Sequence, residues 1–299
     1  MAQSKTAPLV RYCGFTFLLF SALLWVATTI CFLGTWDHVA AITVFPQWSW
    51  AVGGILTAAV AFRLLRSESR LPLFTMLLWL LSCFYFADNL LPVVRGVLHG
   101  AAPKGRAQNS TFRIVTLNCA SSPLAAREVM KFQPDIVLLQ ELPPSNTVAH
   151  LARDWFGEAG SVVAGFDCAI VSHYPLKAID ARMATHHTRA ILTLPQGREL
   201  LVTSLRLTPP LGRTDLWNPA AWRGYKEDRR QRRRELRSVL ETEPRVDLPE
   251  ILAGDFNAPM GDGIYKLLGQ YRDSHRTAGR GWGNTALNDI PLFRLTRFG

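Results

Sequence analysis

Residues 251–259, Ile-Leu-Ala-Gly-Asp-Phe-Asn-Ala-Pro, decide how this chain folds. The apolar run 251–253 predicts a buried strand that delivers Asp255 and Asn257 at its carboxyl end. Because residues two apart on a strand share a face, the carboxylate and the carboxamide are expected to point the same way. A plain turn is the alternative interpretation, since Asp and Asn are common where strands end.

The same pattern, an apolar run followed by polar side chains, occurs twice more upstream. Residues 112–117 (FRIVTL) end at Asn118, and residues 135–139 (DIVLL) end at Gln140 and Glu141. Hard oxygen ligands at strand ends suit Mg²⁺, which takes one or two carboxylates and leaves positions for water and phosphate oxygens. The pattern predicts phosphoester hydrolysis, in which a metal polarises the phosphoryl oxygen while Asp255 and Asn257 orient the attacking water.

Together these segments resemble the endonuclease/exonuclease/phosphatase superfamily, which includes deoxyribonuclease I, abasic-site endonucleases, neutral sphingomyelinases and inositol-polyphosphate 5-phosphatases. The resemblance runs roughly from Thr111 to the end of the chain. It rests on Asn118 in TLNCA, Glu141 in PDIVLLQEL, and Asp255 with Asn257 in AGDFNAP, with further matches at SHYPL (172–176) and at Arg189 in TRAIL.

The resemblance implies an α+β fold, a four-layer α/β/β/α sandwich like that of deoxyribonuclease I, with the active site at one end. It implies Mg²⁺ or Mn²⁺ bound by Glu141 and Asn118. It also implies that Asp255 and Asn257 act at the scissile phosphate, which makes all four residues catalytic candidates.

Two positions depart from the family pattern. Members commonly carry a His in an x-H-L-x-P segment, and Arg206 stands at that place in residues 204–209 (SLRLTP). Arginine stays protonated and is no base, but it binds phosphate oxygens, so Arg206 joins the catalytic candidates; a surface arginine at a strand end is the alternative. Members also end in an Arg-Ile-Asp-x-Ile strand and a Ser-Asp-His segment, whereas here Thr296 replaces the Asp and no terminal His follows. We therefore expect a domain that is incomplete at its C-terminus.

Composition changes near residue 100. Before it lie three apolar segments, approximately 15–33, 48–65 and 71–94. Each is close to the ~20 residues that a bilayer-spanning helix needs, so residues 1–98 are predicted to form a membrane anchor of three transmembrane helices. A signal peptide (first segment) and buried soluble helices are the alternatives. Asp88 is a functional candidate if it lies in the membrane, although Asn89 and Pro92 favour a helix that is already leaving it.

Residues 99–110 are rich in small and turn residues and predict a linker, which leaves 111–299 as the hydrolase domain. The five cysteines are too few for a disulfide framework, and Cys119 is interpreted as a buried strand-end residue. Six arginines between 229 and 237 predict a basic helix that faces solvent or an anionic partner. The loop containing Trp222, and Trp282, are candidates for lining the substrate cleft.

The sequence thus predicts a membrane-anchored, Mg²⁺-dependent phosphoester or phosphodiester hydrolase. The lipid bilayer is one partner, and the substrate is a phospholipid headgroup or nucleic acid; no protein partner is inferable. The alternative is a catalytically impaired pseudoenzyme that acts as a membrane receptor or scaffold. With two family positions altered, we expect very slow turnover or none.

Basic residues in short flanks predict an integral membrane protein whose catalytic domain is extracytoplasmic. Five flank one side (Lys5, Arg11, Arg63, Arg66 and Arg70) and three flank the other (Arg95, Lys104 and Arg106). A reporter that is active only outside the cytoplasm should therefore give signal when fused after Gly299 and none when fused at Arg66. The reverse pattern would place the domain inside the cell.

Overall fold

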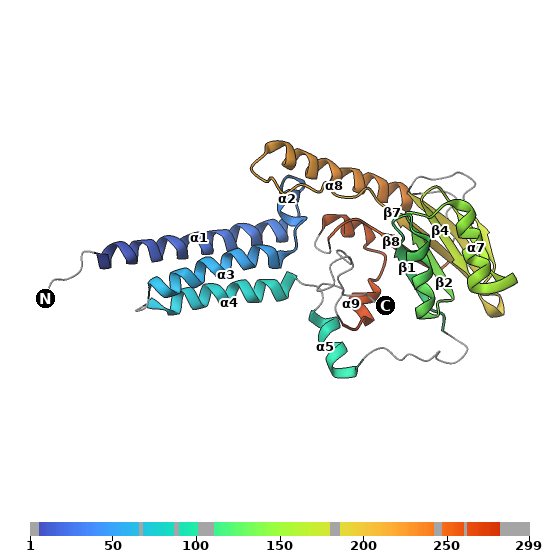
Figure 1. Ribbon diagram of the computed structural model, residues 1–299, viewed down its shortest axis with the longest axis horizontal. Helices are drawn as coiled ribbons and strands as arrows, with labels where there is room; N and C mark the ends of the chain where they lie inside the picture. Colours follow the sequence, from blue (N-terminus) through green and yellow to red (C-terminus); the bar gives the residue numbers. More distant parts are fainter. Residues whose placement is uncertain are drawn as a thin grey trace. The chain divides into compact units, whose positions relative to one another are not determined.

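The computed structural model describes residues 6–65, 68–86, 90–100, 111–179, 186–241, 247–259 and 262–281. Several sequence features lie outside these residues: Lys5, Arg66, Asp88, Asn89, most of the expected linker, Trp282 and Thr296. The chain forms two compact units (Figure 1). One contains the described parts of Met1–Ala102, Leu211–Arg229 and Ala258–Arg297, and the other those of Pro103–Pro210 and Arg230–Asn257.

The first unit is helical. Its elements are α1 (Thr6–Gly34), η1 (Asp37–Val39), α2 (Ala40–Thr43), α3 (Gln47–Leu64), α4 (Arg70–Phe86), α5 (Leu90–His99), the first half of α8 (Pro219–Leu240), η6 (Gly263–Leu268) and α9 (Ser274–Ala278). Of the described helices, only α1 is long and apolar enough by itself to cross a membrane, over Pro8–Gly34. Two bent pairs of helices would complete a set of three spans if each pair crosses as one: η1 and α2 with α3, bent by 67°, and α4 with α5, bent by 79°.

The third predicted span is shorter than the sequence suggested. The expectation was one helix over residues 71–94, but α4 ends at Phe86 and a separate helix begins at Leu90. Pro92 lies in the first turn of α5, where proline is tolerated, and it would break the interior of a continuous helix. One span is therefore supported by the structure, and the other two stay predictions.

The apolar helices α1, α3 and α4 lie side by side (Figure 1) and pack around Trp79. The Trp79 indole is fully buried, and its Nε1 donates to Ser21 Oγ at 3.1 Å. Ser21 Oγ in turn donates to the carbonyl oxygen of Gly54 at 2.7 Å. A Cβ at Gly54 would lie 2.0 Å from the indole, so the close helix contact requires glycine there, as small residues permit in membrane bundles.

The predicted arginine-rich helix exists as α8, but two of its arginines are not solvent-facing as expected. Arg229 is 1% exposed and Arg232 is 2% exposed. Arg229 forms a buried ion pair with Asp262 at 3.0 Å and donates to Thr43 Oγ1 at 2.6 Å and to the carbonyl of Trp36 at 3.1 Å. Paired acceptors offset the cost of burying the charge, and sequence periodicity does not reveal them.

The second unit contains two four-stranded mixed sheets. The first has the order β1-β2-β4-β3 and the second β5-β6-β7-β8. Their strands are β1 (Ile114–Asn118), β2 (Ile136–Gln140), β3 (Ser161–Ala164), β4 (Cys168–Ser172), β5 (Leu176–Ala178), β6 (His187–Thr193), β7 (Glu199–Arg206) and β8 (Glu250–Asp255). Within each sheet one pair is parallel, β1 with β2 and β7 with β8, and the other pairs are antiparallel.

The sheets pack face to face through one apolar core. Side chains of β2 and β4 (Ile136, Leu138, Ile170) meet those of β6 and β7 (Ala190, Leu192, Val202). A second core lies on the other face of the first sheet, where Val137, Leu139, Ala169 and Val171 pack on α6 (Pro123–Arg127), η3 (Glu128–Phe132) and α7 (Ser145–Phe156). Because β2 is covered on both faces, it is a continuous apolar run, as the sequence predicted.

Gly254 is required one residue before Asp255. Its φ is +142°, and a Cβ there would lie 2.0 Å from the carbonyl oxygen of Leu205 on the paired strand β7. The glycine thus lets β8 approach β7 closely at the point where both strands end.

We predict that Gly254→Ala destabilises the protein by more than ~3 kcal/mol or prevents folding, because a backbone clash adds to the unfavourable φ. Gly197→Ala is the matched control: its φ is +75° and nothing lies within 4 Å of the added Cβ. Thermal unfolding of both variants checks this. Equal melting temperatures for the two would show that the contact with Leu205 is unimportant.

Candidate active site

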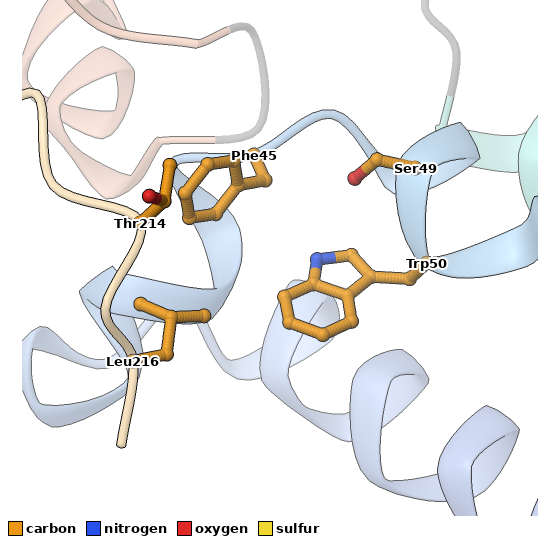
Figure 2. A pocket seen from close by; sticks show the side chains of 5 residues that line it. All are labelled: Phe45, Ser49, Trp50, Thr214 and Leu216. Carbon is orange, nitrogen blue, oxygen red and sulfur yellow. The ribbon is translucent and has the colours of Figure 1, made fainter. Parts of the chain in front are cut away.

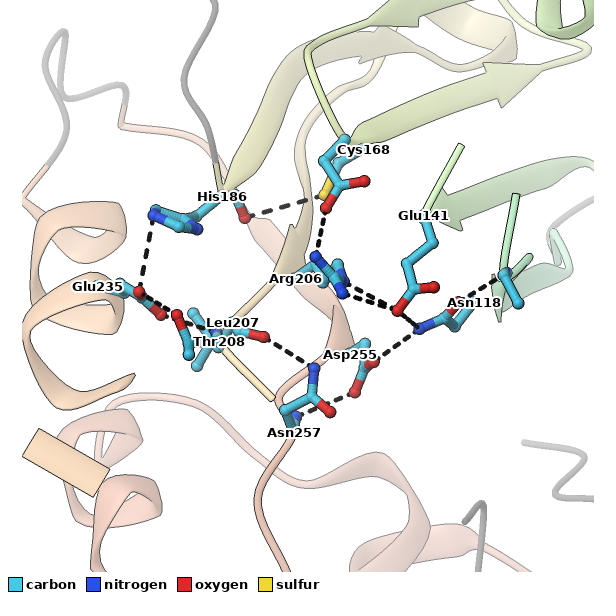
Figure 3. A network of polar contacts seen from close by, with 12 residues as sticks. Asn118, Glu141, Cys168, His186, Arg206, Leu207, Thr208, Glu235, Asp255 and Asn257 are labelled. Carbon is cyan, nitrogen blue, oxygen red and sulfur yellow. Dashed lines mark hydrogen bonds and ion pairs between the residues drawn. The ribbon is translucent and has the colours of Figure 1, made fainter. Parts of the chain in front are cut away.

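The carboxyl ends of the two parallel strand pairs meet at one edge of the second unit. Asn118 ends β1, Glu141 follows β2, Arg206 ends β7 and Asp255 ends β8 (Figure 3). Parallel strands place their carboxyl ends at the same sheet edge, and face-to-face packing brings the two edges together. Four of the five predicted site side chains therefore join one connected set of hydrogen bonds.

The Asn118 side chain links the two sheets. Its Nδ2 donates to Glu141 Oε1 and to Asp255 Oδ2, both at 2.9 Å, while its Oδ1 accepts from the backbone N of Ala120 at 2.9 Å. The donor at Ala120 fixes which way the amide faces, so its nitrogen lies toward the two carboxylates. In this structure Asn118 acts as a donor that holds both carboxylates, and its predicted role as a metal ligand stays a prediction.

Asn257 lies in the left-handed region, with φ of +48°. Strand β8 ends at Asp255, so the period-two argument that put both side chains on one face does not apply to Asn257. Its backbone N donates to Asp255 Oδ1 at 3.0 Å, and its Nδ2 donates to the carbonyl of Leu207 at 2.8 Å. Asn257 thus orients the Asp255 carboxylate through its backbone, a contact that the sequence did not reveal.

Glu141 has the same unusual backbone conformation, with φ of +47°. A left-handed conformation at a non-glycine residue costs ~1–3 kcal/mol and persists where surrounding contacts fix it. Hydrogen bonds from Asn118 and Arg206 lower the pKa of the Glu141 carboxyl below its ordinary value, although burial works in the opposite direction. Glu141 is therefore ionised throughout the neutral range, and its charge is lost only as the pH falls below the ordinary range of a glutamate.

Arg206 lies between two carboxylates. Its Nε and Nη2 donate to Glu141 Oε1 at 3.1 and 2.8 Å, and its Nη1 donates to Asp167 Oδ2 at 2.7 Å. Burial alone would lower the pKa of Arg206, but the charges of Asp167 and Glu141 outweigh it and raise that pKa. Arg206 is thus a permanent cation inside the site.

Asp167 was missed by the sequence reasoning. It directly precedes β4, which begins with the apolar run Cys168–Val171, and β4 pairs antiparallel with β2 so that Cys168 faces Gln140. The amino end of an antiparallel strand lies beside the carboxyl end of its neighbour. A search for polar residues before strands, as well as after them, could have found it.

Gln140 and Arg189 lie elsewhere. Gln140 is 1% exposed, and its Nε2 donates to Ser204 Oγ at 3.0 Å between the sheets, so it holds the core together. Arg189 is buried within β6.

Glu141 suits a divalent cation. Among the described residues, the hydrogen bonds to its carboxylate all converge on Oε1, which leaves Oε2 to a further ligand, and the side chain is 30% exposed. One carboxylate with water and phosphate oxygens is a donor set that Mg²⁺ accepts. No group of three or more His, Cys, Asp or Glu side chains able to hold a metal occurs in the described part of the chain.

The segment after β7 is held from the other side by α8. Glu235 accepts from the backbone N of Thr208 at 2.9 Å and from its Oγ1 at 2.5 Å, and His186 Nε2 lies 3.6 Å from Glu235 Oε1. Burial raises the pKa of Glu235, but the hydrogen bonds from Thr208 and Gln231 and the nearby His186 outweigh it, and the net shift is downward. The carboxylate therefore fixes the chain two residues beyond Arg206.

A separate pocket in the first unit has a different character (Figure 2). It has a volume of about 240 Å³ and is lined by Phe45, Ser49, Trp50, Thr214 and Leu216. None of these side chains is an acid or a base, so this pocket lacks the groups that phosphoester hydrolysis needs. The segment around Trp222 was expected to be a loop, but it is helical because α8 begins at Pro219, and Trp222 packs on Ala40 and Ala41.

Two mixed sheets packed face to face, with this polar cluster where their parallel strands end, define an α+β domain of the deoxyribonuclease I type. The Endonuclease/Exonuclease/phosphatase family pattern matches residues 115–296, more than half of the chain, and the chain belongs to this family. Members of the family generally use divalent metals. No curated protein matches the chain in sequence.

Three solved structures are among those similar to this chain. Humanized TDP2 of D. rerio is 20% identical, with a TM-score of 0.37, over 53% of this chain and 66% of that one. Beta toxin of Staphylococcus aureus (β-hairpin deletion mutant) is 12% identical, with a TM-score of 0.39, over 54% and 72%. The human Nocturnin catalytic domain, with bound sulfate, is 15% identical, with a TM-score of 0.32, over 52% and 68%.

The two cysteines near the site are structural, as the sequence analysis interpreted Cys119. Cys119 and Cys168 are 0% and 1% exposed, and burial raises the pKa of each thiol to about 12. We predict that neither reacts with iodoacetamide at pH 8 in the folded protein, because the thiolate is the reactive form, and that both react after denaturation. Peptide mass mapping checks this, and rapid alkylation of native Cys119 would show that it is an activated thiol.

Proposed function

We propose that this protein is a membrane-anchored, metal-dependent phosphoester hydrolase. The observation that carries the proposal is the convergence of Glu141, Asn118 and Asp255 at the ends of β2, β1 and β8. Family membership supports phosphoester hydrolysis, and the apolar helix α1 supports the membrane anchor.

Glu141 would hold Mg²⁺ or Mn²⁺ through its carboxylate, and a bound cation supplies charge that polarises the phosphoryl oxygen. Asp255 accepts a proton from the attacking water, while the Asn257 backbone N–H and the Asn118 amide fix the orientation of its carboxylate. Arg206 donates N–H groups to a non-bridging phosphate oxygen and stabilises the negative charge that develops there. Each step uses a side chain that the sheet edges already hold in place.

The anchor favours a substrate at the membrane surface, and we propose a phospholipid headgroup. Exposed apolar side chains run along α1, with Leu19 at 60%, Phe20 at 56% and Leu23 at 59% exposure, as expected of a helix that contacts hydrocarbon. An anchored enzyme meets lipid phosphoesters at high local concentration. Nucleic acid is the other candidate, since the part of the chain after residue 99 carries 27 basic and 20 acidic residues.

A receptor or scaffold without turnover is the second candidate function. The observation that favours it is Arg206 at the place where the family commonly carries a His, because arginine transfers no proton. Residues 282–299, where a terminal catalytic segment would fall, lie outside the described residues.

For the full chain in detergent micelles, the proposal selects very slow, Mg²⁺-dependent hydrolysis of bis-p-nitrophenyl phosphate over the absence of turnover. Asp255→Asn should lower the rate a further ~10² to 10⁴-fold, because it removes the base while keeping the size of the side chain. Glu128→Gln, an exposed position, is the matched control. A scaffold predicts no turnover above that of the Asp255→Asn variant, and this outcome would contradict the proposal.

We also expect Glu141→Gln to abolish Mn²⁺ binding by the full chain, since it removes the carboxylate that would hold the ion. Calorimetric titration of the parent and the variant with Mn²⁺ measures this without any substrate. Unchanged Mn²⁺ affinity in Glu141→Gln would show that the ion binds elsewhere.

A further inference from the structure

The Arg206 guanidinium donates hydrogen bonds to the carboxylates of two different residues. Two of its N–H groups reach the same oxygen, Glu141 Oε1, and a third reaches Asp167 Oδ2, which belongs to the residue before β4. All three side chains are partly exposed, Arg206 at 26%, Glu141 at 30% and Asp167 at 21%. The cluster is therefore open to a substrate and is not a sealed core ion pair.

The geometry gives the two carboxylates unequal roles. Hydrogen bonds from Nε and Nη2 to one oxygen atom leave the planar guanidinium able to pivot about that atom. The bond from Nη1 to Asp167 adds a second point of attachment on a different residue, which removes this freedom. Short charge-assisted bonds of 2.7 to 2.8 Å are the strong ones, so both attachments matter.

The guanidinium keeps donors for a ligand. It carries five N–H groups, one on Nε and two on each Nη. Contacts with Glu141 and Asp167 use three of them among the residues that the structure describes, which leaves one N–H on each Nη nitrogen. Both remaining groups belong to a charged donor of the kind that binds phosphate oxygens.

Asp167 lies in a hairpin turn that hydrogen bonds close. The hairpin between β3, which ends at Ala164, and β4, which begins at Cys168, is closed by a bond from the backbone N of Gly165 to the carbonyl of Cys168 at 2.8 Å. The same carbonyl accepts from Thr188 Oγ1 at 2.7 Å. The carboxylate thus extends from a segment that two further hydrogen bonds fix.

We propose that Asp167 is a positioning residue: it holds the Arg206 guanidinium so that its two remaining N–H groups bind the phosphate of the substrate. This inference rests on the proposed function and adds a residue to the same site. Asp167 touches no substrate, so its effect on phosphate passes entirely through Arg206.

The positioning role predicts an unusual direction for the change in phosphate affinity when the charge of Asp167 is removed. Asp167 is negatively charged, and removing a negative charge near an anion site ordinarily strengthens anion binding. If Asp167 instead positions Arg206, removing its charge weakens phosphate binding, because the guanidinium is then free to pivot. The two explanations therefore predict opposite changes for the same variant.

The test is the dissociation constant of inorganic phosphate for the full chain in detergent micelles with Mg²⁺, measured by calorimetry. We expect Asp167→Asn and Arg206→Ala each to weaken phosphate binding about tenfold, which corresponds to ~1.4 kcal/mol. Asp167→Glu, which keeps the charge, should restore part of the loss. The double variant should bind no more weakly than Arg206→Ala alone, since Asp167 acts only through Arg206.

The outcomes distinguish the role of Asp167 from the proposed function. Unchanged or tighter phosphate binding by Asp167→Asn, together with weaker binding by Arg206→Ala, would overturn the role of Asp167 and leave the proposed function standing. A parent chain that binds no phosphate would contradict the proposed function and the inference with it. Glu128→Gln again controls for the loss of one surface carboxylate.

Discussion

The bridge formed by the Asn118 amide is the contact on which the candidate site depends. One nitrogen donates to Glu141 in the first sheet and to Asp255 in the second. Two carboxylates that share one donor lie close together and repel each other, and Arg206 pairs directly with only one of them, Glu141. By donating to both carboxylates, the amide offsets part of their repulsion. It also fixes the position of Glu141, the candidate metal ligand, relative to Asp255, the candidate base.

The rest of the second unit supports this bridge. Gly254 lets β8 close against β7, so that Asp255 and Arg206 end side by side. Beyond the strands, Asn257 binds the carbonyl of Leu207, and Glu235 binds the backbone N of Thr208. The segment that follows Arg206 is thereby held from two directions. Rigid elements of this kind place functional side chains more precisely than free loops do.

Much of the site could be predicted because strand ends are visible in sequence. An apolar run followed by a polar residue locates Asn118, Glu141 and Asp255, and parallel pairing brings them together. The failures have physical causes. Asp167 precedes its strand, and only antiparallel pairing brings it to the site. The burial of Arg229 depends on a partner that is 33 residues away in the sequence. Helix α4 ends at Phe86, within a segment that is apolar throughout in the sequence. The structure also shows contacts of Asn118 that the sequence does not reveal: its oxygen accepts from the backbone N of Ala120, and its nitrogen donates to the carboxylates of Glu141 and Asp255.

The most direct measurement is a double-mutant cycle on kcat/KM for phosphodiester hydrolysis, with Asn118→Ala, Asp255→Ala and the double variant. If one amide positions both carboxylates, the two losses are non-additive: Asn118→Ala lowers kcat/KM by less in the Asp255→Ala background, where only Glu141 is left for the amide to position, than in the parent. If the two losses multiply as for independent residues, Asn118 does not act through Asp255, and the central role of the Asn118 bridge is contradicted.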